Sequence, residues 1–267
     1  METAEKRIRY KSRSDQFVLY PLGDIHAGTT ACAEDRIKER IKEIKDDPFA
    51  LWVGMGDYAE FIAPNDPRWD VKAIASWVEM SNVAESQRRW LLKLFEPIKD
   101  KCLGLLTGNH EETIRLHNYQ DVQLDLCRDL GVKNLGFSCF YRLFFIRNKT
   151  SFAIDCHFEH GSGAAQTEGG KIMRLTRTML GFDAEITAMG HLHDIKVENL
   201  SPLFMDEGLH IKQRPKVGAI TGSWYRAYAP GPYASYAERR GYTPTNLGCP
   251  HFVIRPDKRF VTVNAGP

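Results

Sequence analysis

Residues 103–111, LGLLTGNHE, join a short apolar run to a polar cluster, and this pairing decides the fold. The run from Leu103 to Leu106 has the length and composition of a buried strand. The cluster Gly108-Asn109-His110-Glu111 follows where that strand would meet its loop. Because open α/β sheets place their ligands at the carboxyl ends of the strands, the sequence predicts a functional site at this point.

Four further stretches repeat the arrangement of an apolar run followed by polar residues. They are Phe17 to Leu22 before Asp24-Ile25-His26, Ala50 to Val53 before Gly56-Asp57, Phe152 to Ile154 before His160-Gly161, and Ile186 to Met189 before Gly190-His191-Leu192-His193. Each run reads as a buried strand, so all five polar clusters are expected at strand ends.

Helical spacing of apolar residues fills much of the chain between these runs. It predicts helices at Glu34 to Lys45, Ile74 to Phe95, His117 to Leu130 and Lys171 to Leu180, the last closed by Gly181. A hairpin is expected from Arg7 to Leu22 and another from Phe137 to Cys156, turning at Asn148-Lys149. Later strands are expected at Ile195 to Leu200, Ile211, Val217 to Ile220, Phe252 to Ile254 and Phe260 to Val263.

These elements predict an α/β (α+β) fold built as one domain over residues 1–267. Its core is expected at about 17–200, followed by C-terminal strands and a Tyr/Gly/Pro-rich loop within 201–267. The formal charge of +2 does not by itself favour nucleic acid. Six cysteines without a C-x-x-C pair favour a reducing compartment, and no apolar stretch has membrane-spanning length, so a soluble cytoplasmic protein is expected.

The polar clusters supply carboxylate, amide and imidazole groups, the mixture that a two-metal hydrolytic site needs. The candidate metal ligands are Asp24, His26, Asp57, Asn109, His160, His191 and His193. This set suits Mn²⁺, Fe or Zn²⁺ better than an all-oxygen Mg²⁺ or Ca²⁺ site. We expect two divalent ions, with Mn²⁺ first and Fe, Zn²⁺, Ni²⁺ or Mg²⁺ as alternatives.

The fourth cluster offers two histidines, because His157 lies three residues before His160. We favour His160, since Gly161 follows it while His157 belongs within or at the end of the strand. His157 would then be a core residue or a group that supports a ligand.

The five clusters, in this order, resemble the calcineurin-like metallophosphoesterase superfamily over roughly Phe17 to His193. The resemblance implies a double β-sheet sandwich flanked by helices, with the metals at the carboxyl ends of the strands. It also implies roles for the ligands: Asp24, His26 and His193 on one metal, Asn109, His160 and His191 on the other, and Asp57 bridging both. His110 would be the general acid or a donor to the phosphoryl oxygen.

This resemblance implies an enzyme, a dinuclear metallophosphoesterase in which a metal-bridging hydroxide attacks phosphorus. We favour a phosphodiesterase of nuclease-like type acting on nucleic acid, DNA or RNA, or on a nucleotide, with no role for a membrane. The alternatives are a phosphomonoesterase, including a phosphoprotein phosphatase, and a non-catalytic binding module on the same fold. The oligomeric state is not addressed by the sequence.

Other residues are candidates for substrate contact because they lie near the clusters in sequence. They are Arg115, Lys171 and Arg174, the last two on a basic stripe, together with Tyr58, Asn65 and Arg68 after the second cluster. Glu111 is a candidate to orient the ring of His110. For the aromatic segment from Trp224 to Pro250, a packing cover or an oligomer contact is favoured over base stacking.

Overall fold

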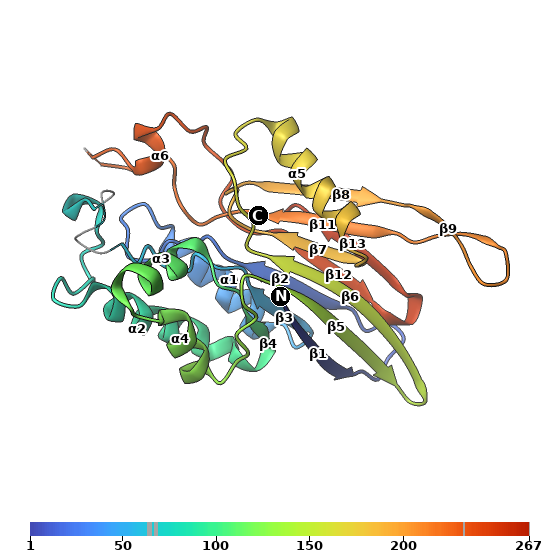
Figure 1. Cartoon of the computed structure of the whole chain (residues 1–267). Coiled ribbons are helices and arrows are strands. Elements are labelled where there is room, and N and C mark those ends of the chain that lie inside the picture. The colour runs from blue at the N-terminus through green and yellow to red at the C-terminus, as the bar shows by residue number, and fades with distance from the viewer. Residues whose placement is uncertain (63–65, 67–68, 232, 267) are drawn as a thin grey trace.

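The computed structural model of the chain describes residues 1–62, 66, 69–231 and 233–266. Within them two β-sheets lie face to face, and helices cover their outer faces (Figure 1). The predicted α/β double-sheet arrangement is therefore confirmed. No helix among the described residues has both the length and the apolar character needed to cross a membrane.

The larger sheet has six strands in the order β1-β5-β6-β7-β11-β8. Their bounds are β1 Glu2–Arg9, β5 Ser138–Arg147, β6 Thr150–Glu159, β7 Ile186–Met189, β11 Lys216–Thr221 and β8 Ile195–Leu200. The smaller sheet has the order β13-β12-β2-β3-β4, with β13 Phe260–Asn264, β12 His251–Arg255, β2 Phe17–Leu22, β3 Ala50–Gly54 and β4 Cys102–Leu105. A separate two-stranded arm consists of β9 Leu203–Met205 and β10 Ile211–Gln213.

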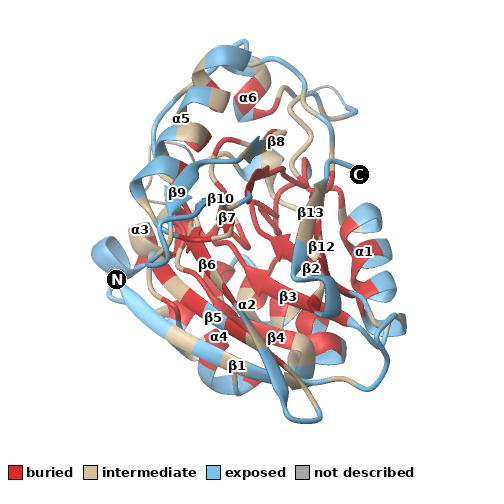
Figure 2. Cartoon of the chain, turned by 90° about the vertical axis from the view of Figure 1, so that its right-hand side faces the viewer, coloured by how far each residue is buried: buried red, intermediate tan, exposed pale blue. Residues whose placement is uncertain are grey.

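Helices pack on both outer faces of the sandwich. The elements are α1 Glu34–Asp46, α2 Val83–Phe95, α3 Asn109–Asn118, α4 Val122–Leu130, α5 Glu168–Gly181 and α6 Tyr236–Arg239, with 3₁₀ turns at Val71–Ala73, Glu96–Lys101 and Pro256–Lys258. Apolar residues of α1, α2 and α4 pack on the smaller sheet, whereas Leu175 and Met179 of α5 pack on the larger one. Between the sheets, Leu19, Phe145, Phe158 and Phe252 are fully buried, and the buried strands form the centre of Figure 2.

The strand directions place the polar clusters together. β2, β3 and β4 run parallel in the smaller sheet, and β6, β7 and β11 run parallel in the larger one. The carboxyl ends of neighbouring parallel strands meet at one edge of a sheet. The five predicted clusters follow β2, β3, β4, β6 and β7, so two sheet edges supply one site.

The predicted hairpin from Arg7 to Leu22 is wrong. β1 pairs in parallel with β5 along all eight of its residues, while β2 lies in the other sheet between β12 and β3. The polar segment at 10–16 carries the chain from one sheet to the other instead of closing a hairpin. Exposed and partly buried residues alternate along β1, as in an edge strand with one covered face. This alternation does not indicate which strand pairs with β1.

The predicted helix from Ile74 to Phe95 is only partly correct, because the α-helix begins at Val83. Asn82 caps it by accepting a hydrogen bond from the Glu85 N–H at 3.4 Å. Trp77 does not continue the helix but stacks on Trp90, with ring centroids 5.4 Å apart and planes 7° apart. Trp77 packs on α2 from outside the helix, and its position in the sequence happens to match helical spacing.

The predicted helix from His117 to Leu130 contains the end of α3 and all of α4. Tyr119 ends α3 with a left-handed φ of 54°, and Asp121 caps α4 by accepting from the Leu124 N–H at 2.9 Å. The other predicted elements are confirmed, including α1, α5, the β5–β6 hairpin and the later strands. Gly181 is the last residue of α5 rather than the residue after it.

Candidate metal centre

The loops that follow the strands hold the predicted ligands in an unusual backbone conformation. Asp24, His26, Asp57, His191 and His193 all have left-handed φ values, between 48° and 70°. Among the described residues ten non-glycine residues have positive φ, so half of them are predicted ligands. This conformation costs on the order of 1 kcal/mol per residue and persists where surrounding structure enforces it. Such strain concentrated in one place indicates a functional site.

The first group contains Asp24, His26 and His193, whose candidate ligand atoms lie within 4.8 Å of one another. The Nε2 atoms of His26 and His193 are 3.1 Å apart, and His193 Nε2 lies 3.4 Å from Asp24 Oδ1. Asp24 is fully buried, and its Oδ2 accepts from the His191 N–H at 2.9 Å. Its Oδ1 has no hydrogen-bond partner among the described residues.

The second group contains Asp57, His160 and His191, with the Asn109 amide between the two rings. Asn109 Oδ1 lies 2.9 Å from His160 Nε2 and 2.8 Å from His191 Nδ1. His160 Nε2 is also 3.3 Å from Asp57 Oδ2. The main-chain carbonyls of Met55 and Gly163 lie 2.7 Å and 3.0 Å from the other nitrogens of the two rings.

These contacts test whether the residues fit a metal ion. A carbonyl oxygen only accepts, so His160 Nδ1 carries the hydrogen and the lone pair of the neutral ring is on Nε2. That lone pair faces the oxygens of Asn109 and Asp57, and such a set repels itself unless a cation or a proton lies among them. Asp24 Oδ1 gives the same indication for the first group, because it is buried without a hydrogen bond and lies only 3.4 Å from His193 Nε2. Both groups could therefore bind a metal ion.

The pKa of His160 reflects this concentration of negative charge. Burial disfavours the protonated ring, but the charge and hydrogen bond of Asp57, with the charge of Asp24, outweigh burial and raise the pKa to about 10. The pKa of Asp57 is held well below its ordinary value, because His160 and His110 outweigh burial. The negative charges that stabilise the proton on His160 would also stabilise a divalent cation at the same place.

His157 lies outside both groups, whereas His160 lies inside the second. His157 is fully buried and stacks on Phe182, with ring centroids 3.7 Å apart. Side chains alternate along β6, so Cys156 and Phe158 face the other sheet while His157 faces α5 and the segment after it. His160 follows the Phe158 side of that alternation, which explains its contact with the Met55 carbonyl.

Glu111 does not orient His110, contrary to the sequence interpretation. Its buried carboxylate accepts hydrogen bonds at 2.9 Å from the main-chain N–H groups of Asp57, Tyr58 and Gly108. It therefore joins the loops after β3 and β4. The close approach requires Gly108, because a Cβ there would lie 2.2 Å from Asp57 N. Burial and the charge of Asp57 raise the pKa of Glu111 to about 7.

Glu60, which the sequence interpretation missed, holds two of the histidines. Its carboxylate lies 2.9 Å from His26 Nδ1, and its main-chain carbonyl lies 2.6 Å from His110 Nδ1. Both acceptors require Nδ1 to carry the hydrogen, so each ring has its lone pair on Nε2. The main-chain N–H of His110 donates to Asp57 Oδ1 at 2.9 Å. A carboxylate three residues after Asp57 was the only signal in the sequence.

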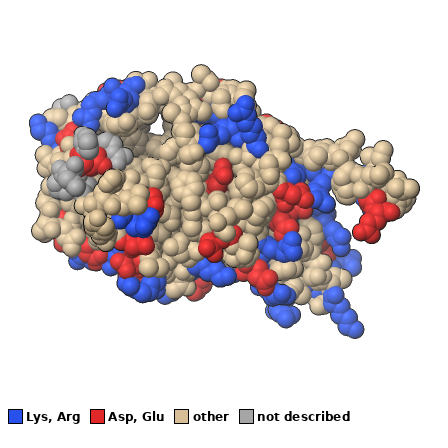
Figure 3. All heavy atoms as spheres, in the orientation of Figure 1, with Lys and Arg blue, Asp and Glu red and all other residues tan. Residues whose placement is uncertain are grey.

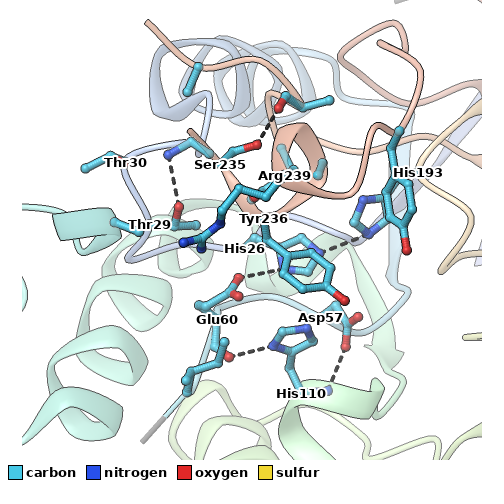
Figure 4. Close-up of a pocket in the computed structure, with 18 of the residues that line it drawn as sticks. His26, Thr29, Thr30, Asp57, Glu60, His110, His193, Ser235, Tyr236 and Arg239 are labelled. Atoms are coloured by element: carbon cyan, nitrogen blue, oxygen red, sulfur yellow. Dashed lines mark hydrogen bonds and ion pairs between the residues drawn. The ribbon is translucent and has the colours of Figure 1, made fainter. Parts of the chain in front are cut away.

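A cavity of about 400 Å³ lies over the two groups. His26, Asp57, Asn109, His110, His191 and His193 line it from the strand ends. Trp69, Asp70, Tyr225, Tyr233, Tyr236 and Arg239 line it from other segments, and Figure 4 shows Tyr236 and Arg239 across from Asp57 and His110. His110 and five of the seven predicted ligands thus line one cavity, whereas Asp24 and His160 are fully buried behind it.

The predicted substrate contacts lie in different places. Arg115 is exposed, pairs with Glu112 at 2.6 Å and does not line the cavity. Lys171 lines it but is buried, with its Nζ 2.8 Å from Asp194 Oδ2. Arg174 donates to the Ser162 hydroxyl at 2.8 Å.

Three further candidates for substrate contact belong to the segment after Asp57. Tyr58 is fully buried and donates its hydroxyl to the Leu106 carbonyl, so it does not reach the cavity. Asn65 and Arg68 lie outside the described residues.

Comparison with known proteins adds little to this geometry. No family model matches the chain, and no curated protein sequence is significantly similar to it. Among solved structures, the crystal structure of Chaetomium thermophilum Vps29 aligns over 93% of each chain, with 11% sequence identity and a TM-score of 0.33. A TM-score this low carries no argument of its own, so the double sheet rests on the strand pairing described above.

Proposed function

We propose that the chain is a dinuclear, metal-dependent phosphoester hydrolase of the calcineurin-like type. The observation that carries this proposal is the pair of adjacent histidine–carboxylate groups, one of which contains the buried Asp24 Oδ1, an atom without a hydrogen bond that lies 3.4 Å from His193 Nε2. One ion would be held by Asp24, His26 and His193, the other by Asn109, His160 and His191, with Asp57 between them. When bound, the ions would supply an activated water and a positive clamp for the phosphoryl oxygens.

The chain's own residues supply the remaining chemistry. His110 lies at the cavity, and its Nδ1–H is directed to the Glu60 carbonyl. Nε2 is then the nitrogen that can hold a proton for the leaving group. An alkoxide leaves poorly without a proton, so this arrangement favours a phosphodiester, in a nucleotide or in nucleic acid, over a monoester with an acidic leaving group.

Metal analysis and hydrolysis assays test the proposal. We expect purified protein loaded with Mn²⁺ to bind up to two ions per chain and to hydrolyse bis-aryl phosphate faster than mono-aryl phosphate. Asp24→Asn should lose bound metal and activity, because it removes one charge from the first group. His210→Asn is the matched control, since His210 is exposed and distant in sequence from the clusters. Less than one bound ion per chain together with no hydrolysis would contradict the proposal. Faster cleavage of mono-aryl phosphate would show that the preferred substrate is a monoester and not a diester.

A further inference from the structure

Two segments far apart in sequence cover the cavity. We call them the covering loops and define them as residues 69–74 and 233–245. Arg239 of one loop lies 3.2 Å from Asp70 of the other. Lys72 lies over the Tyr233 ring, with its Nζ 4.5 Å from the ring centroid. The covering loops thus meet across the cavity and limit what can enter.

Aromatic rings line the cavity together with the histidines. Trp69, Tyr233, Tyr236 and Tyr242 come from the covering loops, and Tyr225 lies next to His26, with ring centroids 5.3 Å apart. Ala73, Ala234 and Ala237 also line the cavity, so small side chains accompany the rings. Aromatic side chains of this kind stack on planar rings with little sequence preference.

The cavity has little positive charge away from the histidines. Among its described lining residues, Lys171 and Arg239 are the only lysine or arginine. Both are paired with carboxylates, Lys171 with Asp194 at 2.8 Å and Arg239 with Asp70 at 3.2 Å. A second phosphate group would therefore find no unpaired lysine or arginine on this described lining. In Figure 3, positive and negative side chains are interspersed over the viewed face, without a continuous basic band for a nucleic-acid backbone.

We infer that the cavity takes a small phosphoester with one phosphoryl group and one flat ring of nucleoside size. This inference rests on the proposed function, because the phosphoryl group would lie at the histidine groups. A volume of about 400 Å³ lies in the range of small-molecule pockets. The ring would stack on the tyrosines of the covering loops, whose mutual contacts hinder a polynucleotide from passing through. Tyr233 and Tyr236 would then determine specificity.

Binding measurements test this inference separately from hydrolysis. In Mn²⁺-containing buffer, calorimetric titration of the full chain with thymidine 5′-monophosphate should show at least about tenfold tighter binding than titration with methyl phosphate. Tyr236→Ala should reduce that ratio several-fold and leave the affinity for methyl phosphate unchanged, whereas Tyr236→Phe should retain the ratio. Tyr228→Ala is the matched control, because Tyr228 is an exposed tyrosine of the same region that does not line the cavity.

The outcomes separate the two proposals. Equal affinity for the two phosphates in the unaltered chain would overturn the inference, even if bis-aryl phosphate is hydrolysed. Tighter binding of short single-stranded DNA without terminal phosphates than of the mononucleotide would also overturn it. Ring-dependent binding without hydrolysis of any ester would support the inference and contradict the proposed hydrolase.

Discussion

The two sides of the cavity are held in place by different forces. On the strand side, Asp24, Asp57 and His160 are buried at the ends of parallel strands and are fixed by main-chain hydrogen bonds. On the opposite side, the covering loops meet through Asp70–Arg239 and Lys72–Tyr233, whose side chains are partly exposed. Exposed ion pairs contribute about 1 kcal/mol or less, so this side is the more easily displaced. Under the two proposals, the strand side would carry the chemistry and the covering loops would select the substrate.

The strongest test of the strand side is Asp57→Asn. Asp57 Oδ2 lies 3.3 Å from His160 Nε2, and its Oδ1 accepts from the His110 N–H, so the change affects the second group and His110 together. We expect loss of bound metal and of detectable hydrolysis, measured by metal analysis and by initial rates. Full metal content in this variant would show that Asp57 is not a ligand.

His110→Asn should separate catalysis from metal binding on the same side. Turnover of a phosphodiester should fall by about 10²- to 10⁴-fold, the usual contribution of a general acid, while the metal content stays unchanged. Rates measured with esters of increasingly acidic leaving groups should converge on those of the unaltered chain. Loss of metal would instead make His110 a ligand.

Glu60→Ala should weaken metal binding by about 10- to 100-fold, because His26 would lose the carboxylate that fixes its ring. Glu60→Gln keeps an accepting oxygen, so its metal affinity should lie between those of the unaltered chain and of Glu60→Ala. Chelator competition would measure the affinity, and Glu79→Ala, at an exposed carboxylate, is the control. No change in Glu60→Ala would mean that the ring is fixed by its other neighbours.

Because of His157, we expect folding stability to depend on pH through the core and not through the cavity. Burial lowers its pKa from 6.5 to about 4, so between these values the unfolded chain binds a proton that the folded chain excludes. This contribution to stability is therefore lost as the pH falls from about 6.5 towards 4, and amounts to on the order of 3 kcal/mol. Urea unfolding at pH 7.5 and 4.5 should show a smaller loss for His157→Leu than for the unaltered chain. An equal loss of stability in the two proteins would show that His157 is not the source of this pH dependence.

The smallest effect is expected on the loop side. Asp70→Asn removes the ion pair with Arg239 and should change the free energy of unfolding by less than about 1 kcal/mol. The affinity for single-stranded DNA should rise about two- to fivefold relative to thymidine monophosphate, because the covering loops would separate more easily. A drop in metal content would contradict the separation of the two sides.

The pattern of apolar runs was sufficient to place the strands and their polar ends. Buried parallel strands have a short, recognisable composition, and β2, β3, β4 and β7 follow it. The partner of β1 and the start of α2 could not be predicted, because strand pairing and the packing of Trp77 on Trp90 are set by distant residues. Alternation along β6 separates His157 from His160 as well, whereas the sequence interpretation used Gly161 and the place of His157 in the strand.

By itself, the sequence determined which chemical groups stand at the strand ends: carboxylates, an amide and imidazoles, each following a buried run. That much is local, because it depends only on neighbours along the chain. Only the tertiary structure decided that Glu60 fixes His26 and His110, that Glu111 joins two loops, and that residues 69–74 meet 233–245 over the cavity. These are contacts between segments whose separation in the chain carries no periodic signal. The pairing of β2, β3 and β4 in one sheet brings the first two together, and the contact between the two covering loops makes the third.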